Sequence, residues 1–140
     1  MQFETQTLII DGLVEHWGKP DPTLNQDLVD IGRSYAGDVF LVAVDENDRV
    51  IGTGALRFGD QGTGQVVRMS VATGSRRLGI GQRILDALVA EARSRGLSSL
   101  ILETTASWRP VRDFYEKSGF VFTHDEVGSF GPDAWYERRL

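Results

Sequence analysis

A short basic turn at residues 76–82, RRLGIGQ, carries the clearest chemical signal in the sequence. Gly79 and Gly81 remove side chains at the expected start of a helix, where backbone N–H groups have no partner within the helix. Arg76 and Arg77 add positive charge beside these amides. Free amide donors, the positive end of a helix dipole and two guanidinium groups together favour an anion, most naturally a phosphate.

Two common phosphate-binding motifs do not fit this turn. The dinucleotide fingerprint GxGxxG would need a third glycine where Ile84 stands, and no GxxxxGK[ST] sequence occurs anywhere in the chain. A simpler interpretation stays open, in which the two glycines only allow tight packing of a helix on a sheet. Packing alone does not require Arg76 and Arg77 beside them.

A strand and a long helix are expected to hold the turn in place. Val66, Val67, Met69 and Val71 predict the strand, and Gly74 with Ser75 breaks it. One apolar helical stripe follows, formed by Ile80, Ile84, Leu85, Leu88, Val89 and Ala92. Gly96 ends this helix, and Leu97–Thr104 reads as a second strand. A strand, helix and strand in this spacing predict a parallel βαβ unit with a right-handed crossover.

The other segments predict a mixed α/β sheet of about six to seven strands with helices on both faces. Further helices are expected at residues 7–17, from Thr23 or Asn25 to Gly37, and at 107–118 with Pro110 in its first turn. Further strands are expected at 39–44, 49–58, 120–124 and 134–138, with a possible short one at 2–5 and a loop at 128–133. Gly52 and Gly54 predict a bulge or a close approach by another backbone.

Composition limits the classes of function. The 140 residues suit one domain, residues 1–140, with ordinary hydrophobic and charged fractions of 41% and 25%. The net charge of −5 argues against nucleic acid as a partner, and no leader or membrane-spanning run is present, so a cytoplasmic location without a membrane partner is expected. The absence of cysteine excludes disulfides and a Cys nucleophile. His16 and His124 share no ligand spacing, so no metal site is expected.

The 76–82 turn resembles the acetyl-CoA-binding motif of the GCN5-related N-acetyltransferase (GNAT) family, in which Arg or Gln is followed after two residues by Gly, one residue, and Gly or Ala. Arg76, Gly79 and Gly81 match it. The resemblance implies that the turn amides hold the cofactor pyrophosphate and that the preceding strand bonds the pantetheine arm. The implied cofactor-binding residues are Met69, Ser70, Val71, Arg76, Arg77, Leu78, Gly79, Ile80, Gly81 and Gln82.

Residues 114–120, FYEKSGF, resemble the second signature of that family. By this resemblance Tyr115 lies near the cofactor sulfur and protonates the departing thiolate, as a phenol with a reference pKa of about 10 is able to do. The alternative, that Tyr115 only packs in the core, stays open. Two positions depart from the family pattern: Trp108 replaces an amide that often contacts the cofactor, and Val111 replaces the usual Ala.

A general base is also required, because an attacking amine must lose a proton. Glu103 is the candidate, since it lies at the C-terminal end of a strand of the βαβ unit, where ligands of open α/β sheets collect. An exposed carboxylate at a strand end, without catalytic role, is the alternative. No Ser-His-Asp arrangement is evident.

The resulting hypothesis is an acyl-CoA-dependent N-acetyltransferase that moves an acetyl group from acetyl-CoA to a small primary amine by direct attack. The family resemblance implies that the acceptor enters between segment 16–25 and a loop at 125–134. Asp21, Asp125 and Glu126 on these segments could attract an ammonium group, and solvated surface is the favoured alternative for each of them. Two alternatives remain: a non-catalytic acyl-CoA-binding or sensing module, and a protein N-acetyltransferase. A monomer or a homodimer is expected.

Overall fold

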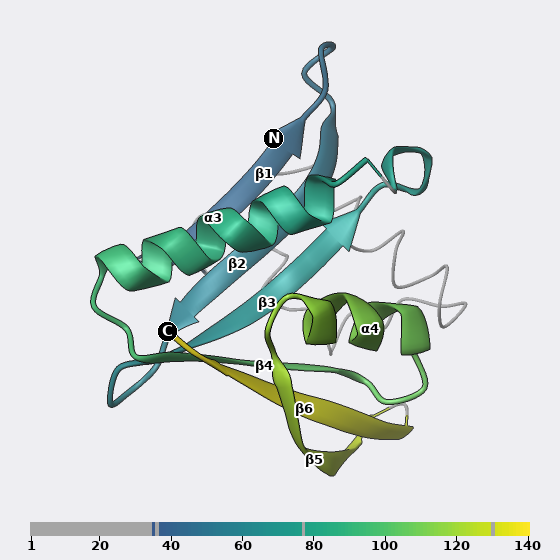
Figure 1. The fold of residues 1–140 in the computed structure, drawn as a ribbon. Coiled ribbons are helices and arrows are strands. Elements are labelled where there is room, and N and C mark those ends of the chain that lie inside the picture. The colour runs from purple at the N-terminus through teal and green to yellow at the C-terminus, as the bar shows by residue number, and fades with distance from the viewer. Residues whose placement is uncertain (1–34, 36, 77, 130) are drawn as a thin grey trace.

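The computed structural model describes residues 35, 37–76, 78–129 and 131–140. Six strands and two α-helices make up this part of the chain (Figure 1). In chain order they are β1 (Val39–Val44), β2 (Val50–Phe58), β3 (Thr63–Val71), a 3-10 turn at Thr73–Ser75, α3 (Ile80–Ser94), β4 (Ser99–Thr105), α4 (Arg109–Lys117), β5 (Val121–Gly128) and β6 (Gly131–Arg139).

The strands form one mixed sheet in the order β1-β2-β3-β4-β6-β5. β3 and β4, which precede and follow α3 in the chain, pair in parallel. Every other neighbouring pair is antiparallel. The parallel βαβ unit and the mixed sheet predicted from the sequence are thus confirmed. The possible strand at 2–5 and the helices expected at 7–17 and from 23 or 25 to 37 lie largely outside the described residues.

Helix α3 packs closely against β2. Its apolar stripe is buried, and it is bounded by Gly79 and Gly96, both in the left-handed backbone region with φ of 77° and 76°. A Cβ at Gly52 would lie 2.9 Å from Ile84 Cδ1, and one at Gly54 would lie 2.5 Å from Ile84 Cγ2. Of the two alternatives predicted for these glycines, the bulge is present, because the pairing of β2 with β3 shifts between Thr53 and Ala55. The close approach is made mainly by side chains of α3 rather than by another backbone.

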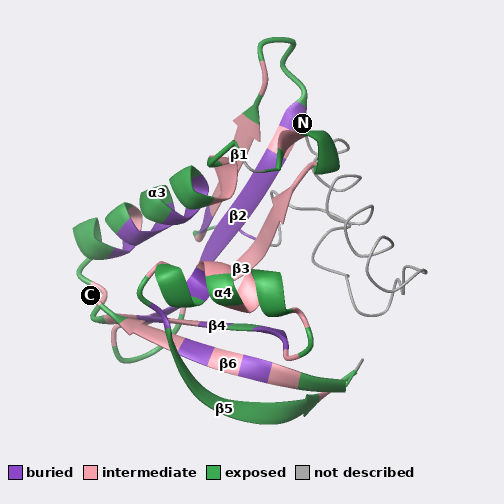
Figure 2. Cartoon of the chain, turned by 45° about the vertical axis from the view of Figure 1, so that its right-hand side comes forward, coloured by how far each residue is buried: buried purple, intermediate pink, exposed green. Residues whose placement is uncertain are grey.

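Both described helices lie on the same face of the sheet (Figure 1). Leu102 and Tyr136 are cross-strand neighbours, both buried on that face. Because side chains alternate along a strand, the neighbouring pair Glu103 and Trp135 points to the opposite face. The alternation is visible along β6, whereas the edge strand β5 is exposed over almost its whole length (Figure 2).

Neither α3 nor α4 is long and apolar enough to cross a membrane.

The prediction of a loop at residues 128–133 is wrong. Antiparallel pairing of β5 and β6 continues to Gly128 opposite Gly131, so only two residues connect the strands. The glycines and Pro132 indicated a longer break, but pairing with β5 and with β4 extends β6 across this region. Asp125 and Glu126 consequently lie within a strand, and their side chains point to opposite faces of the sheet.

Candidate active site

The sheet opens between its two parallel strands. β3 and β4 pair only at Thr63 with Ser99, Gly64 with Leu100 and Gln65 with Ile101, and beyond these positions the strands no longer pair. β3 continues to Val71 and β4 to Thr105. The edge of β3 that faces the opening, which includes Met69, Ser70 and Val71, is therefore not occupied by β4.

A β-bulge in β3 accompanies this opening. Thr53 pairs with Ser70 and Ala55 pairs with Val67, so β3 holds one residue more than β2 across this stretch. Arg68 lies in the left-handed region at φ 56°, and the buried Thr53 hydroxyl donates a hydrogen bond to the Arg68 carbonyl oxygen at 2.7 Å. A bulge bends and twists its strand, which favours the divergence of β3 from β4.

The glycine turn follows β3 after the short 3-10 turn at Thr73–Ser75 and leads into the start of α3. The first helical hydrogen bond of the turn runs from the Arg83 N–H to the Gly79 carbonyl at 3.0 Å, so the amides of Ile80, Gly81 and Gln82 have no acceptor within the helix. A Cβ at Gly81 would lie 3.6 Å from Val71 and 3.7 Å from Phe114, which is ordinary van der Waals contact. The turn therefore presents free donors without a side chain covering them.

The remaining turn residues frame this site. The exposed Arg76 donates from Nε to the Val71 carbonyl oxygen at 3.2 Å, so its side chain folds back toward the end of β3. Leu78 is 70% exposed, and Arg77 lies outside the described residues. Unpaired amides at a helix N-terminus, a glycine in the left-handed region and the open β3 edge beside them fit a pyrophosphate joined to an amide-containing arm. The residues present therefore fit coenzyme A.

Tyr115 lies on α4, the short helix beside the turn. Its ring makes edge-to-face contacts with Phe114 and Phe120, with centroids 5.2 and 5.9 Å apart, and the residue is 6% exposed. Burial raises the pKa of the Tyr115 hydroxyl, so the group stays protonated at neutral pH. Among the described residues the hydroxyl has no hydrogen-bond partner. Within the part of the chain that the structure describes, it is a protonated donor that no other group uses.

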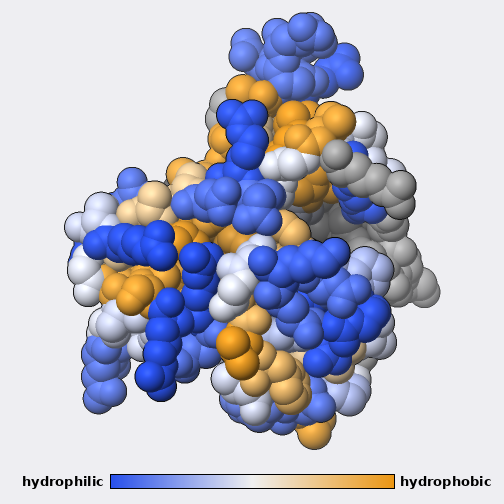
Figure 3. Space-filling view, viewed as in Figure 1, coloured by the Kyte–Doolittle hydropathy of each residue, from blue (hydrophilic) through white to orange (hydrophobic). Residues whose placement is uncertain are grey.

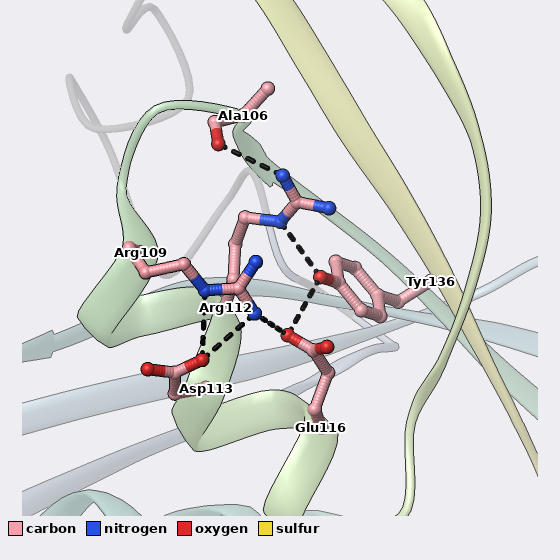
Figure 4. A network of polar contacts seen from close by, with 6 residues as sticks. All are labelled: Ala106, Arg109, Arg112, Asp113, Glu116 and Tyr136. Atoms are coloured by element: carbon pink, nitrogen blue, oxygen red, sulfur yellow. Dashed lines mark hydrogen bonds and ion pairs between the residues drawn. The ribbon is translucent and has the colours of Figure 1, made fainter.

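Polar contacts hold α4 against β6 (Figure 4). The Tyr136 hydroxyl accepts a hydrogen bond from Arg112 Nε at 2.8 Å and donates one to Glu116 Oε2 at 3.2 Å. Arg112 also donates to the Ala106 carbonyl oxygen at 3.0 Å, in the segment that leads into the helix. On the outer side, Arg109 pairs with Asp113 and Glu116. The surface over α4 is correspondingly hydrophilic (Figure 3).

Glu103 lies on the other face of the sheet, two residues beyond the last β4 position that pairs with β3. Its side chain is exposed, and yet its pKa is raised, first by partial burial and then by the negative charges of Asp133 and Glu126. The pKa of Asp133 is raised as well, by burial and by Glu126. Three carboxylates therefore share one face at the open end of β4.

An open hollow of about 400 Å³ extends along the same face. Its lining residues are Ile101, Thr123, His124, Glu126, Trp135, Tyr136 and Glu137. The rings of His124 and Trp135 are parallel, with centroids 6.1 Å apart, and His124 Nε2 lies 3.2 Å from Glu126 Oε1. Glu126 thus links the hollow to the carboxylates around Glu103. Among the described residues, no group of three His, Asp or Glu side chains is arranged to hold a metal ion.

The structure brings some of the predicted site residues together and separates others. The turn, the β3 edge and α4 lie around one opening, and Glu103 lies across the sheet from α4. Asp125 is paired with Ala134 and points away from Glu103, so it does not join Glu126 as expected. Asp21 and segment 16–25 lie outside the described residues. Asp133 and Trp135 were missed as neighbours of Glu103, because only the pairing of β4 with β6 brings them there.

The two positions that depart from the family signature, 108 and 111, lie at the start of α4. Trp108 precedes the helix, and its backbone N–H donates to the Thr105 carbonyl oxygen at 3.0 Å. Val111 packs against the hydrophobic core. Val111 therefore acts as a larger core residue at the position of the usual Ala, and the turn before α3 is unaffected by either change.

A mixed sheet that opens beside a glycine turn is the acetyl-CoA-binding architecture that the resemblance implied. The family model described as the acetyltransferase (GNAT) family matches residues 5–120. The chain is also 32% identical over 126 residues to an IAA acetyltransferase of Azospirillum brasilense, covering 89% of this chain and 82% of that protein. The chain therefore belongs to the GNAT family, and it is an acetyltransferase of that family.

Solved structures of the same fold agree with this assignment. A GNAT-family acetyltransferase of Staphylococcus aureus Mu50 has a TM-score of 0.88 and 25% identity, covering 99% of this chain and 92% of its own. A putative streptothricin acetyltransferase of Bacillus anthracis, solved in complex with acetyl coenzyme A, has a TM-score of 0.67 and 19% identity, covering 74% and 62%. At that identity the second comparison shows the fold alone.

Proposed function

We propose that this protein transfers the acetyl group of acetyl-CoA to a small primary amine by direct attack. The observation that carries the proposal is the opening between β3 and β4, which has the free amides of the α3 turn at one end. A protonated tyrosine lies on α4, and a carboxylate with a raised pKa lies on the other face. Donor and acceptor are thereby expected to approach the opening from opposite faces of the sheet.

Each element has one role in this reaction. The amides of the turn and the edge of β3 hold the pyrophosphate and the pantetheine arm, which places the thioester in the opening. Glu103, as the deprotonated carboxylate, takes the proton that the acceptor ammonium must lose before nitrogen attacks. Tyr115 donates its hydrogen bond and then its proton to the sulfur as the carbon–sulfur bond breaks. The nitrogen loses its second proton as the amide forms, proton exchange with solvent restores Tyr115 and Glu103, and the products are an N-acetylated amine, free CoA and one proton.

The charge of the acceptor face supports an amine. Glu103, Asp133 and Glu126 gather negative charge there. Burial first and repulsion by the other two carboxylates second raise the pKa of Glu103, and an approaching ammonium relieves that repulsion. The hollow beside them, about 400 Å³ in volume, suits a compact ligand. The similar protein of Azospirillum brasilense is likewise an acetyltransferase named for a small molecule, IAA.

The replacement Gly81→Asp is expected to abolish stabilisation of the protein by CoA. It places a carboxylate beside the turn amides, where it repels the pyrophosphate, while an acidic residue in the first turn of a helix does not destabilise the free protein. Ligand-induced stabilisation follows the ratio of ligand concentration to Kd, so thermal unfolding with and without CoA measures the loss.

Gly81→Ala is the matched control. Its Cβ meets Val71 and Phe114 at ordinary contact distances and carries no charge, so stabilisation by CoA should persist. If Gly81→Asp responded to CoA as the wild type does, the assignment of the pyrophosphate to this turn would be wrong.

The acceptor class is tested by comparing free amines with peptides that present the same amine at the N-terminus. We expect kcat/KM to favour the free amines, because the hollow on the Glu103 face is small and a long peptide needs an extended groove. Release of the CoA thiol provides the measurement. A hundredfold preference for the peptides would instead identify a protein N-acetyltransferase.

A further inference from the structure

Tyr136 is buried more deeply than Tyr115. Tyr136 lies on β6 beneath α4, is 1% exposed, and makes both of its hydroxyl hydrogen bonds to that helix. It accepts from Arg112 Nε and donates to Glu116 Oε2 (Figure 4). A buried hydroxyl that forms hydrogen bonds with two residues of one helix fixes the rotation of the helix about its axis as well as its distance from the sheet.

The two positions that Tyr136 contacts lie on either side of Tyr115 along α4. Arg112 and Glu116 are four residues apart, about one helical turn, and Tyr115 immediately precedes Glu116. Because successive residues of a helix are separated by about 100°, fixing Arg112 and Glu116 against β6 also fixes the direction of Tyr115. Arg112 extends this constraint to the segment before the helix through the Ala106 carbonyl oxygen.

α4 depends on such contacts because it is short. Its nine residues form a helix of a length that is marginal in isolation, so packing against the sheet decides where it lies. Arg138 of β6 donates to the Ser118 carbonyl oxygen at 2.9 Å and holds the end of the helix. The ion pair of Arg109 with Asp113 runs along the exposed side of the helix and joins two residues of α4 only.

We propose that Tyr136 is a positioning residue, which sets the orientation of α4 and thereby directs the Tyr115 hydroxyl into the opening between β3 and β4. The Tyr136 hydroxyl makes its hydrogen bonds to Arg112 and Glu116, and it acts through these two residues. This inference rests on the acid role proposed for Tyr115. It adds a requirement from β6 to a reaction whose other groups lie on α3, α4 and β4.

The test is a double-mutant cycle with Tyr136→Phe and Tyr115→Phe. Tyr136→Phe keeps the ring and its contact with Phe122 and removes only the hydroxyl. We expect kcat to fall about tenfold in the wild-type background, since small misplacements of a catalytic group reduce rates strongly. The Kd for CoA, measured by calorimetry, should stay within about twofold, because the turn on α3 is untouched.

In the Tyr115→Phe background, the same replacement should change kcat by less than about twofold, because the group that Tyr136 positions is already gone. A purely structural role predicts the same fractional loss in both backgrounds.

Arg112→Lys serves as a second variant: it keeps the positive charge but cannot hold Tyr136 and Ala106 together, so it should reproduce the loss. Asp113→Asn, which breaks only the exposed ion pair, is the matched control and should retain wild-type kcat.

The outcomes separate this inference from the proposed function. If Tyr115→Phe alone had wild-type kcat, the acid role would fall, and the positioning role with it. If Tyr115→Phe were slow while Tyr136→Phe and Arg112→Lys kept wild-type kcat, the positioning role alone would be overturned. Equal fractional losses in both backgrounds would also overturn it and assign Tyr136 to the stability of the fold.

Discussion

Replacing Tyr115 with Phe is expected to lower kcat about 10²-fold or more while leaving the affinity for CoA close to that of the wild type. The phenyl ring keeps the contacts with Phe114 and Phe120, and only the proton donor disappears. The departing sulfur carries negative charge as the carbon–sulfur bond breaks, and in a site of low polarity a neutral donor at hydrogen-bond distance stabilises that charge strongly. Single-turnover kinetics would separate this step from binding and product release.

The stability of this variant provides the control. Among the described residues the Tyr115 hydroxyl has no hydrogen-bond partner, so removing it breaks no bond within that part of the free protein. The midpoint of thermal unfolding is therefore expected to stay the same or to rise. A slow enzyme with undiminished stability would indicate a chemical role, whereas wild-type kcat would show that Tyr115 only packs in the core.

Replacing Glu103 with Gln is expected to lower kcat/KM at neutral pH by about 10² to 10⁴, the usual range for loss of a general base. The wild-type rate should rise with pH through the raised pKa of Glu103, above the ordinary value of 4.5, because only the carboxylate accepts a proton. Asp133→Asn removes one of the charges that raise this pKa, so the rising limb of its pH–rate profile should move to lower pH. The pH dependence of kcat/KM for the three proteins is the measurement.

The same pKa shift predicts that stability falls with rising pH while the rate increases. Glu103 holds its proton more tightly in the folded chain than in the unfolded chain, so between the two pKa values the folded state binds more protons. The free energy of unfolding therefore falls as pH rises from about 4.5 through the raised pKa. Glu103→Gln removes this loss, so the variant should be at least as stable as the wild type at neutral pH.

Glu91→Gln is the matched control for Glu103→Gln. Glu91 lies on α3, on the other face of the sheet from Glu103, where it forms an exposed ion pair with Arg95 at 3.4 Å. The variant should keep near wild-type kcat/KM. Equal losses in both variants would assign the effect to the net charge of the protein rather than to a base at Glu103.

The elements around the turn could be predicted from the sequence because their signals are local. The apolar stripe from Ile80 to Ala92 specifies one helical face, and Gly79 and Gly96 mark its ends through a backbone conformation that glycine adopts easily. Alternation along a strand also determines which residues share a face once the strand is known. The turn, α3 and the parallel pair were accordingly found with boundaries within a few residues.

The features that decide the geometry of the site could not be predicted in the same way. The bulge at Arg68 places a non-glycine residue at positive φ, and a hydrogen bond from Thr53 on another strand supports it. The neighbourhood of Glu103 depends on the pairing of β4 with β6, and the setting of α4 depends on Tyr136, both of which are distant in sequence. The β5–β6 connection was predicted too long because the Gly and Pro residues there favour a loop, whereas strand pairing overrides that preference.

The most direct test of the proposed reaction is to incubate the protein with acetyl-CoA and a panel of small primary amines and to quantify both products. Free thiol is measured by a colorimetric reagent and the N-acetylated amine by mass spectrometry. The proposed function predicts at least one amine for which the two products form in equal amounts, and predicts that Gly81→Asp forms neither. Saturable binding of acetyl-CoA with no thiol release above the uncatalysed rate for any amine or peptide would contradict it and identify a binding or sensing module.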